Sequence, residues 1–195
     1  MLARILARRE AESRAGHLAR CLILSALGAA LTAIGSRIAI PLWPVPVTLQ
    51  VFFVLLCGAA LGRKWAAAAQ AQYLAAGLCG LPVFAGGGAG PAALLGPTGG
   101  YLVGFVAAAY VTGWLTEVLA SRRAGRCVAT LAGAAVIWLC GWAWLAVWAL
   151  AGSEAAPLRA AFAWGVAPFV ALDAVKAVAA AGAGRLLGGV VGERT

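Results

Sequence analysis

Asp173 and Lys176 are the residues of this sequence best suited to chemistry, because they are a charged pair inside a long apolar run. The motif PFVALDAVK, residues 168–176, spaces them three residues apart, and side chains at that spacing share one face of a helix. Counted at about 1.5 Å per residue from Ala160, they lie roughly 20–24 Å along the predicted helix, near or somewhat past mid-membrane. Ionised side chains at such a depth are costly, which makes them functional candidates. Two interpretations stay open: a mutually neutralising salt bridge that only orders the bundle, or an acceptor and a donor for a polar ligand.

Further polar and aromatic side chains lie in other apolar runs. Gln50 is about one turn into its run, and it should face inward because lipid is costly for a long amide. Tyr73 is the best placed residue of the next run to present an inward hydroxyl. Four tryptophans crowd a later run, and they would either face lipid or form an aromatic wall against a ligand: Trp138, Trp142, Trp144 and Trp148.

Catalysis finds little support in this sequence. His17 is the single histidine, and it lies in a basic N-terminal stretch away from the apolar runs. The five cysteines have no CxxC or CxxH spacing, so we expect them to pack as small hydrophobic residues. No Walker motif is present, so any ATP use must belong to partners. We therefore expect a protein that is not an enzyme and that needs no metal or cofactor.

The elements that must position these residues are membrane helices. The 195-residue chain is 64% hydrophobic and 11% charged, whereas soluble proteins average about 45–50% apolar and about 25% charged residues. Because a membrane helix needs about 20 apolar residues, the length allows about six. The sequence predicts an all-α integral membrane protein of six helices, over residues 18–39, 47–62, 65–84, 101–120, 127–150 and 160–187. Residues 1–195 would form a single membrane domain, with a basic arm (1–17), a six-helix bundle (18–187) and a tail (188–195).

The basic residues predict the orientation of this bundle. With a cytoplasmic N-terminus, twelve Lys and Arg residues fall on the cytoplasmic side, against Arg37 and Arg159 outside. This split is a strong positive-inside signal and puts both termini in the cytoplasm. It also argues against nucleic-acid binding, because the charge is spread along a membrane face without a recognition motif. The cytoplasmic set comprises Arg4, Arg8, Arg9, Arg14, Arg20, Arg63, Lys64, Arg122, Arg123, Arg126, Arg185 and Arg194.

Two connections on the predicted outer side have unusual compositions. IPLWPVPVTLQ, residues 40–50, contains three prolines, which cannot continue a helix and indicate a stiff hairpin. LPVFAGGGAGPAALLGPTGGY, residues 81–101, has seven glycines, three prolines and no charge, and predicts irregular backbone rather than helix. Irregular backbone near a membrane is tolerated where it lines a cavity, so this segment is expected to cap a small-molecule site. Phosphate binding is disfavoured because the Lys and Ser/Thr of a P-loop are missing.

Small residues four positions apart, as in Ala26-xxx-Ala30 and Gly100-xxx-Gly104, let helix backbones approach closely in lipid. They predict either packing inside the bundle or, at Ala26 and Ala30, a face that docks a partner membrane protein.

Four motifs, in this order, resemble the biotin-specific substrate-binding subunits (S components) of energy-coupling-factor (ECF) vitamin importers, the BioY family: IPLWPVPVTLQ, GLCGLPVFAGG, GPTGGYLVGF and PFVALDAVK. The resemblance covers about residues 20–187. It implies a six-helix ECF S-component-like bundle that captures biotin from the outside. It also implies partners, namely a transmembrane coupling protein and two cytoplasmic ATPase subunits.

The resemblance further implies a binding site. In that family a conserved Asp and Lys of the last helix contact the vitamin, and they match Asp173 and Lys176. The connection after the third helix, residues 83–100 here, covers the site. This chain departs from some relatives, because it has no Asn or Arg in that connection. Polar contacts would then come from loop backbone or other side chains, and apolar contacts from aromatic rings; the candidates are Gln50, Tyr73, Phe84, Gly86, Gly87 and Tyr101.

Biotin suits this pair chemically. Its ureido group offers two N–H donors and a carbonyl, so Asp173 should accept from the ureido N–H. Lys176 would donate either to the ureido oxygen or to the valerate carboxylate.

The function that the sequence supports best is therefore high-affinity biotin uptake across a bacterial or archaeal cytoplasmic membrane, as the substrate-specific subunit of an ECF-type importer. Two alternatives stay open: an S component for a different vitamin, and a structural membrane subunit that transports nothing. Whether uptake needs the ATPase partners also stays open.

Overall fold

The computed structural model describes the backbone of residues 2–191 and the side chains of residues 14–187. The described chain is nearly all helical, with one small hairpin. Much of the predicted basic arm and of the tail, including Arg4, Arg8, Arg9 and Arg194, lies outside the described side chains. The elements are α1 (Leu2–Gly35), β1 (Ala39–Ile40), β2 (Val47–Thr48), α2 (Gln50–Leu61), α3 (Arg63–Leu78), the 3-10 helix η1 (Ala85–Gly87), α4 (Pro91–Leu95), α5 (Gly99–Val118), α6 (Gly125–Ala151), α7 (Pro157–Gly165) and α8 (Val170–Val191).

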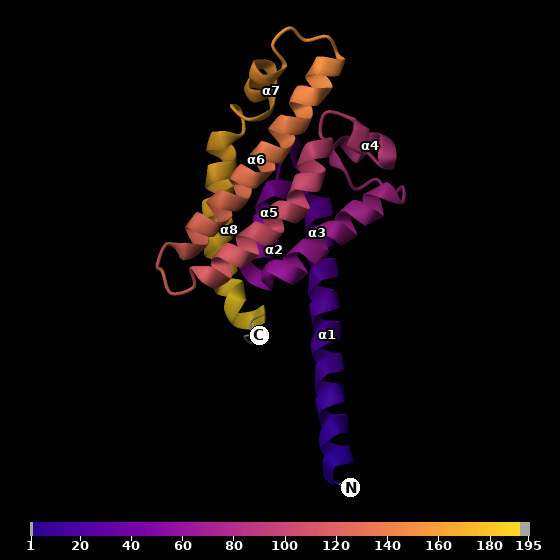
Figure 1. Cartoon of the computed structure of the whole chain (residues 1–195), viewed down its shortest axis with the longest axis vertical. Helices are drawn as coiled ribbons and strands as arrows, with labels where there is room; N and C mark the ends of the chain where they lie inside the picture. Colours follow the sequence, from indigo (N-terminus) through magenta and orange to yellow (C-terminus); the bar gives the residue numbers. More distant parts are fainter. Residues whose placement is uncertain (1, 192–195) are drawn as a thin grey trace.

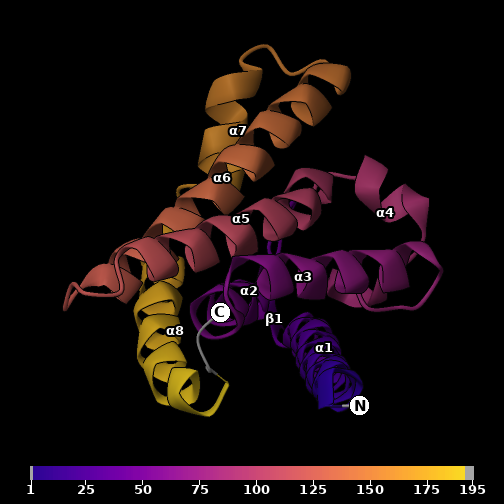
Figure 2. The same ribbon diagram turned by 60° about the horizontal axis from the view of Figure 1, so that its bottom comes forward.

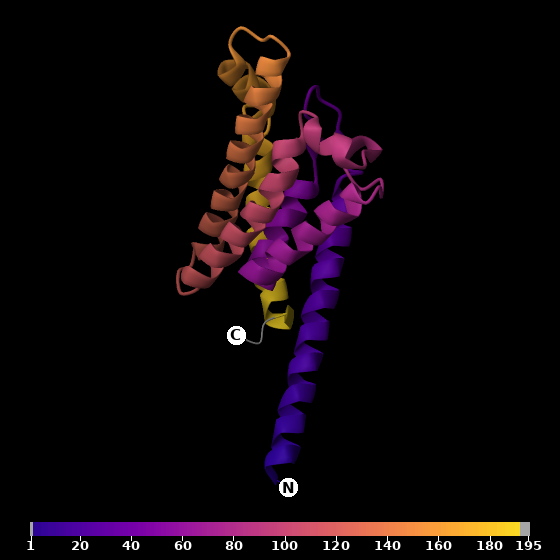
Figure 3. The same ribbon diagram turned by 45° about the vertical axis from the view of Figure 1, so that its right-hand side comes forward.

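Apart from the short helices η1, α4 and α7, successive helices run in alternating directions (Figure 1). In Figures 1 and 3, α1, α3 and α6 lead away from the end that carries both termini, and α2, α5 and α8 lead back to it. The hairpin, α4 and the α6–α7 connection lie at the opposite end. Viewed toward the terminal end, α2 is surrounded by α1, α3, α5 and α8, and it packs on all four (Figure 2). A short helix in the centre of the bundle thus ties the longer ones together.

Three helical segments are long and apolar enough to cross a membrane: Arg14–Gly35, Gly99–Val118 and Gly125–Ala151. The pair α7 and α8 would make a fourth span if it is counted as one, although it is bent by 50°. The apolar helix α2 has 12 residues and is shorter than the about 20 that span a bilayer. Among the described residues, three or four spans therefore satisfy these criteria, and six remains a prediction.

The last predicted helix, residues 160–187, is wrong as a single element. Pro168 lies at the break between α7 and α8, where its missing N–H and its effect on the preceding residue disfavour continuous helix. Because α8 begins only at Val170, Asp173 lies in its first turn rather than 20–24 Å along a helix. A carboxylate there is favoured by the positive end of the helix macrodipole.

The connection between the predicted helices 47–62 and 65–84 is a single residue in the structure. Gly62 alone separates α2 from α3, and its φ of 75° is in the left-handed region that favours glycine. Arg63 already belongs to α3, where its backbone N–H donates to Glu117 Oε1 at 2.9 Å. A single glycine therefore reverses the chain, and the pairing with α5 fixes the turn.

The two predicted outer connections are partly as expected. Residues 39–48 form an antiparallel hairpin in which Ala39 pairs with Thr48 and Ile40 with Val47. The segment 81–101 is not wholly irregular, because it contains η1, α4 and the first residues of α5. Pro91 begins α4, a position where its missing N–H costs nothing.

The small-residue pairs differ in their surroundings. Gly100 and Gly104 pack against α6, where an added Cβ would meet the Trp144 Cβ at 2.2 Å and the Cys140 Cβ at 2.8 Å respectively. Ala26 and Ala30 are instead exposed on α1. The first pair thus mediates helix packing inside the bundle, whereas the second faces outward.

Candidate functional site

A cavity of about 50 Å³ lies where the hairpin, the start of α2, the segment before α5 and the facing sides of α5, α6 and α8 meet. Its wall is largely aromatic and aliphatic, with a few polar groups, which is the composition of small-molecule sites. Four of the predicted site residues line it: Gln50, Phe84, Tyr101 and Asp173.

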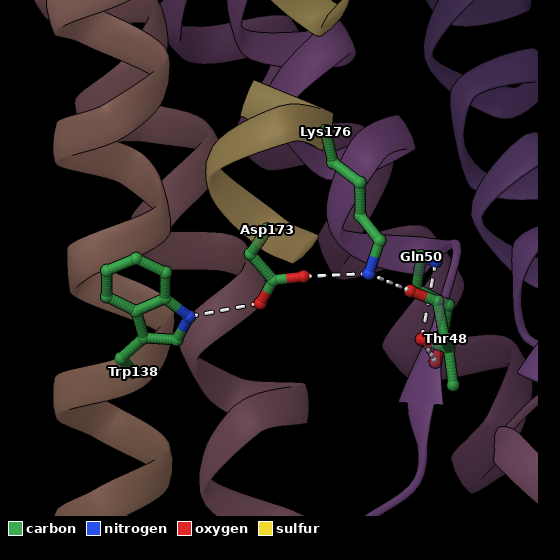
Figure 4. Close-up of polar contacts among 5 residues, drawn as sticks. All are labelled: Thr48, Gln50, Trp138, Asp173 and Lys176. Carbon is green, nitrogen blue, oxygen red and sulfur yellow. Dashed lines mark hydrogen bonds and ion pairs between the residues drawn. The ribbon is translucent and has the colours of Figure 1, made fainter. Parts of the chain in front are cut away.

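Asp173 supplies the negative charge at this cavity, although its carboxylate is almost fully buried. Its Oδ2 accepts a hydrogen bond from Trp138 Nε1 at 3.0 Å, and its Oδ1 accepts one from Lys176 Nζ at 2.7 Å (Figure 4). The two donors approach from different helices, α6 and α8. They hold the carboxylate in one orientation and compensate its desolvation.

Lys176 lies beside the cavity rather than on its wall. Its Nζ donates to the Thr48 carbonyl at 2.8 Å as well as to Asp173, and so it joins α8 to the hairpin (Figure 4). The one-turn spacing that the sequence predicts is confirmed as an i,i+3 ion pair. The pair is neutral as a whole, which lowers its cost inside a membrane protein.

The pair retains unused hydrogen-bonding capacity. An ammonium group has three N–H donors, and Lys176 uses two of them on described residues. Each carboxylate oxygen has about two acceptor sites, and one on each oxygen of Asp173 is taken. The arrangement can therefore accept from a ligand N–H and donate to a ligand oxygen without losing its own contacts.

Gln50 is buried and faces inward, as its sequence position predicts, but it is the first residue of α2 rather than one turn into it. The Thr48 hydroxyl donates to Gln50 Oε1 at 3.1 Å, and Gln50 Nε2 donates to the Tyr73 hydroxyl. Tyr73 in turn donates to the Val83 carbonyl at 3.3 Å. A continuous polar chain thus links the hairpin, α2 and α3 to the segment that follows α3.

Tyr101 and Phe169 form another part of the cavity wall. The Tyr101 hydroxyl donates to the Gly165 carbonyl at 2.7 Å, and its ring lies 6.3 Å from that of Phe169. Gly165 ends α7 and Phe169 precedes α8, so Tyr101 of α5 fixes both sides of the break.

Phe84 is the residue of the 81–101 segment that reaches deepest. It is buried, and its ring packs edge-on to Tyr73 at 5.6 Å. Gly86 and Gly87 adopt positive φ angles of 67° and 80°, which explains the glycines, but neither lines the cavity. Gly87 instead lies against Arg37, and Arg37 donates to the Pro82 carbonyl. The structure therefore brings Phe84 to the cavity and keeps the two glycines away from it.

Sequence reasoning missed several residues that line the cavity. Phe169 is four residues before Asp173, a spacing that could have identified it as sharing a helix face. Thr48 is two residues before Gln50 in an extended segment, where alternate residues share a side. Trp138 was one of four candidate tryptophans with no pattern to single it out. The others are Val45, Pro46, Val51, Ala85, Thr98, Leu102, Phe105 and Ile137.

The described residues contain no cluster of three His, Cys, Asp or Glu side chains that could hold a metal ion. The fold and the site instead define a class: a nearly all-helical membrane protein with a small, mostly apolar cavity that is lined by the acidic member of a buried ion pair.

The chain belongs to the BioY family, whose defining sequence pattern matches residues 8–192. It is 42% identical over 157 residues to a protein of Pyrococcus horikoshii described as a probable biotin transporter, covering 80% of this chain and 89% of that one. It is 43% identical over 162 residues to the biotin transporter BioY of Thermotoga maritima, covering 83% and 92% of the two chains.

The fold is also found in a solved structure. The crystal structure of the S component for biotin from an ECF-type ABC transporter superposes with a TM-score of 0.75. It is 26% identical in sequence, and the match covers 88% of this chain and 92% of that one.

Proposed function

We propose that this chain is the biotin-specific substrate-binding subunit of an ECF-type importer and that it binds biotin without changing it chemically. The observation that carries the proposal is the buried Asp173–Lys176 pair at the cavity, which offers an acceptor and a donor from one neutral unit. The family, the two biotin transporters and the solved biotin S component supply the identity of the ligand.

The proposed contacts with biotin use the hydrogen-bonding capacity that Asp173 and Lys176 leave free. A ureido N–H of biotin would donate to Asp173, and Lys176 would donate to the ureido oxygen or to the valerate carboxylate. Charge-assisted bonds of this kind contribute about 1.5–3 kcal/mol each. The rings of Tyr101, Phe169 and Phe84 would cover the apolar part of the ligand, with Gln50 and Tyr73 as additional polar groups.

The cavity must enlarge to accept such a ligand. Its volume of about 50 Å³ is well below the about 300–1,000 Å³ of sites for drug-sized molecules. Phe84 and Ala85 belong to the segment that covers it, so movement of residues 83–100 would admit the ligand from the outer side.

We also propose that the chain crosses a bacterial or archaeal cytoplasmic membrane six times, with both termini in the cytoplasm. Two observations support this. The helices α1, α2, α3, α5, α6 and α8 run in alternating directions (Figure 1), and the α2–α3 and α5–α6 turns at the terminal end carry basic residues. In this arrangement the short α2 and the bent α7–α8 pair each complete a crossing.

Uptake would involve a transmembrane coupling protein and two cytoplasmic ATPase subunits. The outward-facing Ala26 and Ala30 of α1 are a candidate contact for the coupling protein, because small exposed residues allow close helix approach.

Biotin titration of the purified protein in detergent tests the proposed function, followed by tryptophan fluorescence because Trp138 lines the cavity. Thiamine and riboflavin serve as control ligands, because either would bind if the chain were specific for that vitamin. We expect saturable binding of biotin alone. Binding of another vitamin in its place would support an S component of different specificity, and binding of none would leave a structural subunit.

A further inference from the structure

A second, larger hollow lies at the end of the bundle that carries both termini. Its volume is about 430 Å³, and it is formed by residues 119–123 of the α5–α6 connection together with Arg126 of α6 and Arg185 of α8. It shares no lining residue with the cavity at Asp173. Four arginines line it: Arg122, Arg123, Arg126 and Arg185.

The positive charge of this hollow is not neutralised by the described part of the chain. Three acidic side chains fall within residues 14–187, and none of them lines the hollow: Glu117 pairs with Arg63, Asp173 pairs with Lys176, and Glu154 lies in the α6–α7 connection at the opposite end. Arg185 donates instead to the Arg123 carbonyl at 2.9 Å. That bond ties α8 to the connection and keeps the cationic groups together.

One buried donor group lacks a partner at this place. Arg126 Nε is shielded from solvent and has no hydrogen-bond partner among the described residues. Arg126 is also the second residue of α6, a 27-residue helix that Ala124 precedes without a side-chain cap. The first turn of such a helix attracts anions, because it lies at the positive end of the helix macrodipole.

Exposed apolar side chains lie close to the arginines along the chain. Val118, Val128 and Leu186 are 59%, 50% and 79% exposed, and each is within two residues of a position that lines the hollow. Val118 belongs to α5 and Val128 to α6, which are candidate membrane spans, and Leu186 belongs to α8. The place thus combines a multivalent cationic hollow with exposed apolar side chains at the end of membrane helices.

We propose that this hollow binds the phosphate headgroup of an anionic phospholipid, with the acyl chains along Val118, Val128 and Leu186. Basic pockets between membrane helices recognise such headgroups, and arginine suits phosphate because its planar fork donates two parallel bonds. The exposed apolar side chains favour a lipid over an acidic segment of a partner protein, which would need no acyl-chain surface.

Native mass spectrometry of the purified chain in uncharged detergent tests the proposal, with phosphatidylglycerol, phosphatidylcholine and inorganic phosphate as separate probes. We expect phosphatidylglycerol to bind about tenfold more tightly than phosphatidylcholine, because a net anion gains charge-assisted bonds that a zwitterion does not. Equal binding of both lipids would overturn the proposal and favour a partner's acidic segment. Binding of inorganic phosphate as tightly as of phosphatidylglycerol would also overturn it, in favour of a soluble anion.

Matched variants separate a built site from general charge attraction. Arg126→Gln and Arg122→Gln should each weaken phosphatidylglycerol binding about tenfold, whereas Lys64→Gln should not. Lys64 is an exposed cation of α3 that does not line the hollow, and its replacement removes the same charge. An equal loss in Lys64→Gln would overturn the proposal. Biotin titration of each variant reports folding, since none of the three lines the biotin cavity.

Discussion

At the residue scale, Asp173 is unusual because a carboxylate with 1% exposure retains acceptor capacity toward a cavity. Burying a charge costs free energy unless it is paired and hydrogen-bonded. Lys176 and the Trp138 indole meet that requirement here and also orient the carboxylate. The same contacts that make the pair tolerable in the bundle thus prepare it for a ligand.

Asp173→Asn and Lys176→Ala should each lower the affinity for biotin about tenfold or more, because each removes a charge-assisted contact of about 1.5–3 kcal/mol. Equilibrium binding of radiolabelled biotin measures the effect. Each single variant leaves one partner of the pair without its contact, so the double variant, Asp173→Asn with Lys176→Ala, serves as a control. Thermal unfolding reports the stability of each variant. Wild-type affinity in both single variants would rule out this pair as the site.

Trp138→Phe should weaken biotin binding about tenfold, because it keeps an aromatic ring but removes the donor to Asp173 Oδ2. Trp142→Phe is the matched control. It makes the same chemical change on the same helix. Trp142, however, does not line the cavity, and its Nε1 donates to the Leu158 carbonyl. Equal losses of affinity in radiolabelled-biotin binding would show that Trp138 does not act through Asp173.

At the scale of the elements, the break between α7 and α8 matters most for the site. It sets the start of α8 at Val170 and so places Asp173 in a first turn. Tyr101 of α5 and the residues on both sides of the break then close the cavity wall. Close contact between α5 and α6 supports this wall, because Gly141 of α6 leaves room for the Tyr101 ring.

Gly141→Ala should destabilise the bundle by about 1–3 kcal/mol, because the added Cβ would lie 2.1 Å from Tyr101 Cε1. Gly182→Ala makes the same change in α8, where nothing lies within 4 Å. It should be neutral or stabilise by about 0.5–1 kcal/mol through helix propensity. Thermal unfolding in detergent compares the two. Equal midpoints would contradict the close packing of α6 on Tyr101.

At the scale of the whole molecule, the structure separates two ends of different character. The hairpin, α4 and the α6–α7 connection lie at one end, and both termini lie at the other (Figure 3). The uncharged segment over the cavity belongs to the first end, and the arginine-lined hollow belongs to the second. This difference between the two ends suits a protein that receives a ligand on one side of a membrane and is oriented by its basic residues on the other side.

Labelling of intact cells with a membrane-impermeant maleimide tests the proposed orientation. In a background with the other cysteines replaced by serine, the exposed Cys79 at the end of α3 should react from outside. Lys64→Cys, with Cys79 also replaced, should react only after the membrane is permeabilised. The opposite pattern would invert the proposed topology.

Composition and residue spacing indicate a nearly all-helical membrane chain, the places of most of its helices and Asp173 with Lys176 as a candidate pair, because these features can be read along the chain. The separation of α7 from α8, and the contacts of Trp138 and Thr48 with the pair, follow only from the folded structure. In an apolar helix every face looks alike in sequence, and a contact between residues 35 or 128 positions apart depends on how their elements pack.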